Sequence, residues 1–139
     1  MSLRITRSEA PSDADRKAVL APLRAYNISQ AGDPRIAPVA ILLTDDDGKA
    51  VGGLWGKTSY DWLFVELLAV PDAWRGGGYG TALMQEAELV ARAHGCVGIW
   101  LDTFEFQARG FYEKLGYALF GTLEDHPVGR RRYFLSKRL

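Results

Sequence analysis

The sequence predicts an α/β fold with a mixed central sheet and the element order β-α-β-β-β-α-β-α-β-β. Apolar residues alternate at period two in several short runs and recur at helical spacing in others. An apolar run at residues 62–70 is typical of a strand in the centre of a sheet. A glycine-rich turn then leads directly into a helical pattern, and strands that alternate with helices define this fold class.

The first half of the chain predicts one helix and a hairpin. Ser12 and Asp15 form a loose capping box at the start of the helix, and helical spacing of apolar residues continues to the breakers at residues 32–34. The acidic run Asp45-Asp46-Asp47-Gly48 has the composition of a hairpin turn and is too short for an EF-hand calcium loop. The strands predicted in this half are residues 3–7, 39–44 and 50–56.

The second half predicts four more strands and two helices. The strand at residues 62–70 is expected to be buried on both faces, and the helix after the glycine turn is expected to stop near Gly95. The remaining elements are a strand at 97–103, a short helix at 106–115 capped by Gly116, and strands at 117–123 and 131–136. At 139 residues the chain has the length of one domain, residues 1–139.

Composition excludes several classes of protein. Seventeen basic and 17 acidic residues give a formal net charge of zero, which argues against a nucleic-acid partner. The single cysteine, Cys96, excludes an internal disulfide, and we expect it to be a small buried hydrophobe in a reducing compartment. Because no signal peptide and no long apolar run occur, we expect a soluble cytoplasmic protein with no membrane partner.

The turn at residues 75–81 predicts a site for a phosphorylated ligand. Glycines let the backbone approach a ligand closely, and the first N–H groups of a helix have no partner within it. Arg75 adds a positive charge beside these groups. A P-loop at Gly56-Lys57-Thr58 is excluded because Val51 stands where its first glycine belongs, and the dinucleotide pattern fails because Thr81 replaces its third glycine.

Two motifs give the chain a family resemblance. The first is Arg75-x-x-Gly78-x-Gly80, preceded by Leu-Ala-Val-Pro, and the second is Phe111-Tyr112 followed by Gly116-Tyr117. In this order they resemble the GNAT superfamily of acetyl-CoA-dependent N-acetyltransferases. The resemblance implies a mostly antiparallel sheet of about seven strands, with splayed central strands and helices on both faces. It also implies acetyl-CoA as co-substrate and no metal.

Glu66 is the candidate general base. It is the only charge within residues 62–70, and an unpaired carboxylate in a buried strand is costly. It must therefore face a groove, find a partner or take up a proton. A partly dry cleft raises the pKa of a carboxyl group, which suits a general base near neutral pH. A structural glutamate is the alternative, whereas the resemblance implies a base that acts directly or through water.

Tyr112 is the candidate general acid. It shares a helix face with Phe111 and Leu115, so we expect its ring to pack inward, and a plain core tyrosine is the alternative. The resemblance implies that it protonates the departing thiolate. The resemblance further implies cofactor contacts from Leu68, Ala69, Val70, Arg75, Gly76, Gly77, Gly78, Tyr79, Gly80 and Thr81. Glu105 stands where many family members have an asparagine, so Gln107 is proposed to supply the missing amide.

The resulting prediction is an N-acetyltransferase that moves the acetyl group of acetyl-CoA to a primary amine of a small molecule or peptide. A non-catalytic acetyl-CoA-binding regulatory domain or a protein-interaction domain is the alternative. The weak candidates for the acceptor groove are Trp55, Tyr60, Asp61 and Trp62. The three arginines at residues 130–132 are expected either to protect a strand edge from aggregation or to bind an anionic group. His94 and His126 are expected to be structural. A monomer and a homodimer through the terminal strands both stay open.

Overall fold

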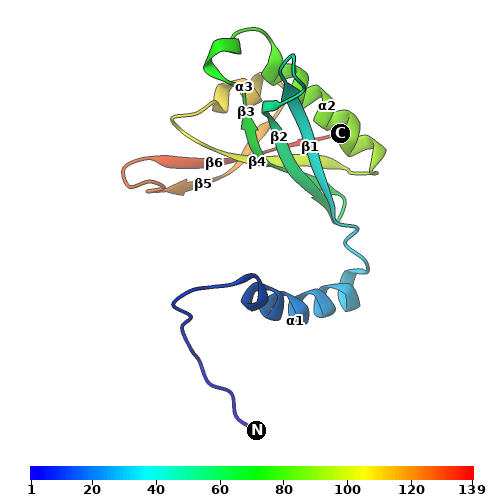
Figure 1. Ribbon diagram of the computed structural model, residues 1–139, viewed down its shortest axis with the longest axis vertical. Helices are drawn as coiled ribbons and strands as arrows, with labels where there is room; N and C mark the ends of the chain where they lie inside the picture. Colours follow the sequence, from blue (N-terminus) through cyan, green and yellow to red (C-terminus); the bar gives the residue numbers. More distant parts are fainter. The chain divides into compact units, whose positions relative to one another are not determined.

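The computed structural model describes all residues from Met1 to Leu139, and these divide into two compact units (Figure 1). The first unit is Met1–Pro34 and the second is Arg35–Leu139. No helix of either unit has both the length and the apolar character needed to cross a membrane. The expectation of a single domain stays a prediction, and each unit is described by itself.

The first unit consists of helix α1, Asp13–Ala31, and the residues that flank it. The predicted capping box is confirmed: Asp15 N–H donates to Ser12 Oγ over 3.1 Å, and Ser12 N–H donates to Asp15 Oδ2 over 3.0 Å. The strand predicted at residues 3–7 is wrong, because these residues form no strand. A strand needs a neighbour for its backbone hydrogen bonds, and this unit contains no second strand.

The second unit is a mixed sheet of six strands in the order β1-β2-β3-β4-β6-β5. Only the β3–β4 pair is parallel, so the predicted mostly antiparallel α/β sheet is confirmed with six strands in place of about seven. The elements are β1 (Ala37–Thr44), β2 (Ala50–Ser59), β3 (Trp62–Ala69), η1 (Asp72–Trp74), α2 (Tyr79–Ala93), β4 (Gly98–Phe104), α3 (Arg109–Lys114), β5 (Ala118–Glu124) and β6 (Arg131–Arg138).

The core of this unit lies between the sheet and helices α2 and α3, which Figure 1 shows on the same side of the sheet. Every second strand residue points toward these helices, as the period of a strand requires. The buried residues on this side include Leu54, Leu63, Val65, Ile99, Leu101 and Leu135 from the strands, Met84, Ala87 and Ala91 from α2, and Tyr112 from α3.

The opposite side of the sheet is aromatic. We call it the aromatic face; its residues are Trp62, Phe64, Trp100, Asp102, Phe104, Arg132, Phe134 and Ser136. The prediction that residues 62–70 are buried on both faces is wrong, because only Leu63 and Val65 of β3 are fully buried. Neither α2 nor α3 covers the aromatic face. Phe64 and Trp100 instead shield each other by stacking at 4.1 Å between ring centroids.

Candidate functional site

Strands β3 and β4 separate halfway along their length. Their pairing runs from Trp62–Gly98 to Val65–Leu101 and then stops, although β3 continues to Ala69 and β4 to Phe104. The predicted splay of the central strands is therefore confirmed. The first residues beyond the last pair are Glu66 on β3 and Asp102 on β4, so two carboxylates flank the opening where the strands diverge.

A β-bulge places Glu66 at this opening. In the β2–β3 ladder Gly56 pairs with Val65 and Trp55 pairs with Leu67, so Glu66 is an extra residue without a partner on β2. A bulge of this kind bends its strand and redirects side chains. Gly56 is required at this point because a Cβ there would collide with the Phe64 carbonyl. Glu66 is consequently exposed to solvent, so it avoids the cost of a buried unpaired charge, and its role as a base stays a prediction.

The glycine turn follows β3 and the short helix η1, and it leads directly into α2. Gly76 and Gly78 adopt φ angles of 81° and 83°, in the left-handed region that favours glycine. A Cβ built on either residue would meet no atom within 4 Å. Backbone conformation, and not crowding inside the protein, therefore demands glycine here, and the space above the turn is open.

The start of α2 presents unpaired backbone donors to this space. The first helical hydrogen bond runs from Ala82 N–H to Gly78 O over 3.0 Å, so the preceding N–H groups of Tyr79, Gly80 and Thr81 have no carbonyl within the helix. No side chain caps this end of the helix. Such a turn suits the oxygens of a phosphate or diphosphate, because its donors and the helix dipole both favour negative charge.

Arg75 is exposed and already has two partners near the turn. Its guanidinium forms an ion pair with Asp72 at 2.8 Å and donates from Nε to the Val70 carbonyl over 3.2 Å. These contacts tie the start of the turn back to the end of β3. The predicted contact of Arg75 with a phosphate stays a prediction. It requires the guanidinium either to leave its ion pair with Asp72 or to bind Asp72 and the phosphate together.

Helix α3 brings Tyr112 close to the start of α2. A Cβ on Gly80 would approach the Phe111 ring to 3.2 Å, so glycine at this position allows the two helices to meet. Tyr112 is only 7% exposed and packs edge-on against Phe111 and Tyr117, with centroids 5.1 and 6.1 Å away. Its ring therefore points inward, as predicted from the sequence.

The environment of Tyr112 keeps its hydroxyl protonated. Burial, and then the negative charge of Asp102, raises the pKa of Tyr112 to about 12. A phenol with this pKa holds its proton throughout the neutral range, so at neutral pH Tyr112 is a proton donor and not a base. Burial likewise raises the pKa of Tyr117, whose hydroxyl is buried without a hydrogen-bond partner.

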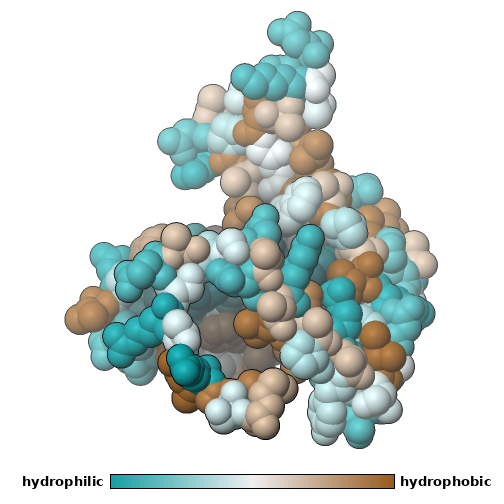
Figure 2. Space-filling view, turned by 60° about the horizontal axis from the view of Figure 1, so that its bottom comes forward, coloured by the Kyte–Doolittle hydropathy of each residue, from teal (hydrophilic) through white to brown (hydrophobic).

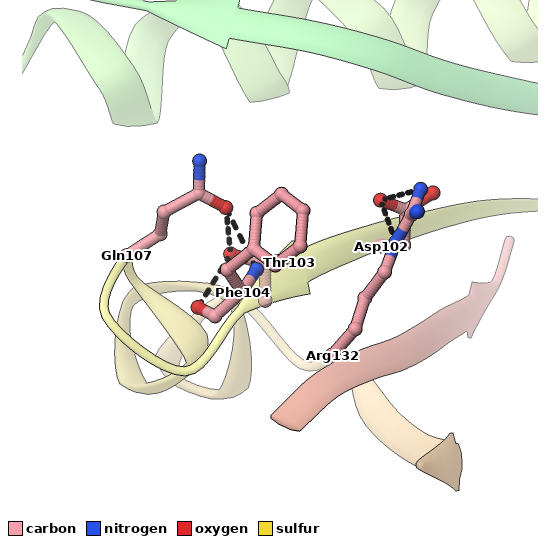
Figure 3. A network of polar contacts seen from close by, with 5 residues as sticks. All are labelled: Asp102, Thr103, Phe104, Gln107 and Arg132. Atoms are coloured by element: carbon pink, nitrogen blue, oxygen red, sulfur yellow. Dashed lines mark hydrogen bonds and ion pairs between the residues drawn. The ribbon is translucent and has the colours of Figure 1, made fainter. Parts of the chain in front are cut away.

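Gln107 closes the turn between β4 and α3 (Figure 3). Its side-chain oxygen accepts from Phe104 N–H over 2.7 Å and from Thr103 Oγ1 over 3.1 Å. Its amide nitrogen is directed away from this turn in Figure 3. The oxygen is thus committed to the protein, and the amide nitrogen is the group left for the predicted contact with a cofactor.

Sequence reasoning missed Asp102. It accepts two hydrogen bonds from Arg132 on the neighbouring strand β6, at 2.6 Å from Nη2 and 2.9 Å from Nε (Figure 3). The signal for it was available in the sequence, because Asp102 is the only charge in β4 just as Glu66 is the only charge in β3. The same pattern that identified Glu66 identifies the carboxylate on the other side of the opening.

The weak acceptor candidates divide into two groups. Trp55 lies opposite the bulge through its pairing with Leu67. Tyr60 and Asp61 form the β2–β3 turn at the other end of these strands, with φ angles of 45° and 71°, and Asp61 pairs with Arg35 at 2.6 Å. Trp62 begins β3 at that same distant end. Of the four, only Trp55 lies beside the opening.

An apolar cavity of about 480 Å³ lies on the aromatic face, lined by Trp62, Trp100, Phe120 and Ser136. The space-filling view shows a hollow with a hydrophobic floor on one side of the molecule (Figure 2). The two tryptophans belong to the paired part of β3 and β4, so this cavity lies beside the stretch of sheet that precedes the opening at Glu66. Cys96 is buried as predicted, and burial raises the pKa of its thiol, which makes it a poor nucleophile.

Comparison with known proteins agrees with this geometry. The model of the Acetyltransferase (GNAT) family matches residues 6–117. The chain is 38% identical over 128 residues to Acetyltransferase Atu2258 of Agrobacterium fabrum, across 91% of this chain and 93% of that protein. It is 35% identical over 138 residues to Blasticidin-S acetyltransferase of Streptomyces morookaense, across 99% of each.

A solved structure agrees as well. The crystal structure of an acetyltransferase from Agrobacterium tumefaciens matches with a TM-score of 0.93 at 35% identity, over 99% of this chain and 100% of that chain. The family match covers most of the chain and includes both motifs around the diverging strands. The chain therefore belongs to the GNAT family of acetyltransferases and is an acyltransferase.

Proposed function

We propose that this protein transfers the acetyl group of acetyl-CoA directly to the primary amine of a small molecule. One observation carries the proposal: β3 and β4 diverge between a donor-rich glycine turn and a buried, protonated tyrosine. A phosphate site, an exposed strand edge and an acid–base pair are the parts that acyl transfer from a thioester requires.

The residues around the opening fit acetyl-CoA as co-substrate. The N–H groups from Gly76 to Thr81 would hold its diphosphate, and Arg75 would add charge. Beyond the last β3–β4 pair, the backbone of Leu68–Val70 would bind the pantetheine arm, with the Gln107 amide nitrogen as a further donor. An N–H of this strand, that of Leu68, would polarise the thioester carbonyl.

Two side chains would move the protons. Glu66, directly or through a water molecule, would take a proton from the ammonium group of the acceptor, because only the neutral amine is a nucleophile. The amine nitrogen would then form a bond to the thioester carbon while the carbon–sulfur bond breaks. Tyr112 would give its proton to the departing thiolate and recover one from solvent.

The acceptor is proposed to be a small-molecule amine. The 35% identity to Blasticidin-S acetyltransferase over 99% of each chain supports this class over a peptide amine. A cytoplasmic location, the absence of nucleic-acid and membrane partners, and the choice between monomer and homodimer stay predictions.

Two measurements on the purified chain test the proposal. Calorimetric titration with acetyl-CoA is expected to show binding to one site, and a panel of small amines is expected to release free thiol from acetyl-CoA. Binding without thiol release from any amine would favour a regulatory domain. If acetyl-CoA does not bind at all, the glycine turn is only a turn and a protein-interaction domain is the better description.

A further inference from the structure

Two phenylalanines form a stacked pair just beyond the opening. Phe104 ends β4, and its ring lies parallel to that of Phe106, with centroids 5.1 Å apart and an interplanar angle of 4°. His126, from the loop between β5 and β6, meets Phe104 edge-on at 5.3 Å. We call the Phe104–Phe106 pair the ring platform. Phe106 is 53% exposed, so part of its ring is open to solvent beside the stacked pair.

A guanidinium without an acidic partner lies over this platform. The arginines at residues 130–132 have three different environments in the structure. Arg131 pairs with Glu124 at 3.1 Å, and Arg132 pairs with Asp102 at 2.6 Å. Arg130 forms no ion pair, and its guanidinium carbon lies 5.4 Å from the centre of the Phe106 ring. A ring that stacks on Phe106 must therefore displace this guanidinium outward, and because Arg130 is exposed, its planar group can move to cover the second face of that ring.

The ring platform borders the proposed acceptor side of the opening. Phe104 follows Asp102 by two residues and so lies on the same face of β4, within about 10 Å along the strand from the last β3–β4 pair. Glu66 flanks the opening from the other strand at the same level as Asp102. Along the strand direction the platform therefore begins roughly 7 Å beyond the level of Glu66.

We propose that the acceptor carries a planar conjugated ring, which inserts between the Phe106 ring and the Arg130 guanidinium, while its amine reaches Glu66. This inference rests on the proposed acetyltransferase function and adds the chemical class of the acceptor. Stacking selects flatness and π-electrons over apolar bulk alone, so a flat ring binds better than a puckered ring of the same size. If the platform only holds the β5–β6 hairpin in place, this selectivity is absent.

A pair of shape-matched amines tests the proposal. 2-Phenylethylamine and 2-cyclohexylethylamine have the same carbon skeleton and differ in whether the ring is flat. We expect the wild-type kcat/KM with acetyl-CoA to favour the flat ring by about fivefold to tenfold. In Phe106→Leu this ratio is expected to fall to about one through a higher KM for the phenyl compound. Phe120→Leu is the matched control, because Phe120 is equally apolar and 59% exposed but lies beside the cavity.

The outcomes separate the two proposals. An unchanged ratio in Phe106→Leu overturns the platform, and loss of the ratio only in Phe120→Leu assigns the ring to the Trp62–Trp100 cavity instead. If acetyl-CoA binds but no amine is acetylated, the proposed function fails. Binding of 2-phenylethylamine to the platform can then still be measured by saturation-transfer NMR of its phenyl protons in the presence of CoA. Loss of that signal in Phe106→Leu supports the platform, and equal signals overturn it. Thermal melts verify that both variants are folded.

Discussion

The first and second halves of the β3–β4 pair have opposite properties. Trp62–Val65 pairs with Gly98–Leu101, and within this half Leu63 and Ile99 are fully buried. Beyond it the two strands separate, and the residues that follow include two carboxylates, an exposed leucine and a phenylalanine at the end of β4. Both halves belong to the same two strands and have similarly apolar sequences.

The difference shows how one sheet provides both stability and chemistry. In the paired half the backbone hydrogen bonds between β3 and β4 are made within the sheet and alternate side chains lie in the core, so its backbone has nothing left to offer a ligand. In the diverging half the facing backbone edges of β3 and β4 no longer pair with each other, and these edges with Glu66 are the groups proposed to bind and react. Substitutions in each half, and at the turn and helix that flank the opening, test this division.

The largest effect is expected at Tyr112. Tyr112→Phe removes the proposed acid while keeping the ring, and should lower kcat by about a thousandfold with little change in acetyl-CoA affinity. Tyr117→Phe is the matched control, since its hydroxyl is buried without a partner and its ring lies beside that of Tyr112. This control should keep its activity and gain about 1 kcal/mol of stability. Steady-state kinetics that show equal losses in both variants would contradict an acid role for Tyr112.

Glu66→Gln is expected to lower kcat/KM at neutral pH by about a hundredfold, because the amide cannot accept the ammonium proton. Glu86→Gln, an exposed change on α2, serves as the control for charge alone. Equal values of kcat/KM in Glu66→Gln and Glu86→Gln would remove Glu66 from the role of base.

Alkaline pH should destabilise the wild-type protein through Tyr112. Its pKa is about 12 in the folded chain against 10.0 for an unperturbed tyrosine, so folding keeps a proton that the unfolded chain releases above pH 10. The contribution of Tyr112 to the free energy of unfolding is fully present below pH 10 and is lost as the pH rises toward 12. About 1.4 kcal/mol of it is lost at pH 11. Urea midpoints at pH 9 and pH 11 should therefore differ less in Tyr112→Phe than in the wild type. An equal difference in both would count against this linkage.

Gly78→Ala should reduce acetyl-CoA affinity by about tenfold, because an added Cβ disfavours the backbone conformation that aims the α2 donors. Gly48→Ala is a close control: both glycines have left-handed φ angles, 83° and 79°, and neither added Cβ meets an atom within 4 Å. Both changes should cost about 1 kcal/mol of stability. Calorimetry should find weaker binding only in Gly78→Ala, and equal affinities would mean that the turn does not hold the ligand.

Much of this fold could be predicted from local patterns. The capping box at Ser12, the glycine turn and the alternation in the strands depend on neighbours in sequence, and all three reappear in the structure. The strand predicted at residues 3–7 failed because pairing is a non-local property. The same limit applied to residues 62–70, whose apolar run predicted burial on both faces although only alternate residues at its start are covered.

The site was predictable in its parts but not in its arrangement. Glu66 stood out as a single charge in an apolar run, yet the bulge that exposes it depends on how β2 pairs with β3. Asp102 carried an equal signal in the next strand, but its meaning depends on where the parallel pairing stops. Gln107 was selected for its amide, and only the geometry of the turn shows that its oxygen is already used.

The smallest effect tests the paired half directly. Ile99→Val removes one methyl group from a fully buried side chain and should cost about 1 kcal/mol of unfolding free energy, because the core is too well packed to close the gap. Leu67→Val also removes one carbon, but Leu67 lies past the last β3–β4 pair and is 60% exposed, so we expect a cost below about 0.5 kcal/mol. Urea denaturation measures both. Similar costs would mean that the diverging half contributes to the core as the paired half does, and the division between a stabilising and a reactive half would not hold.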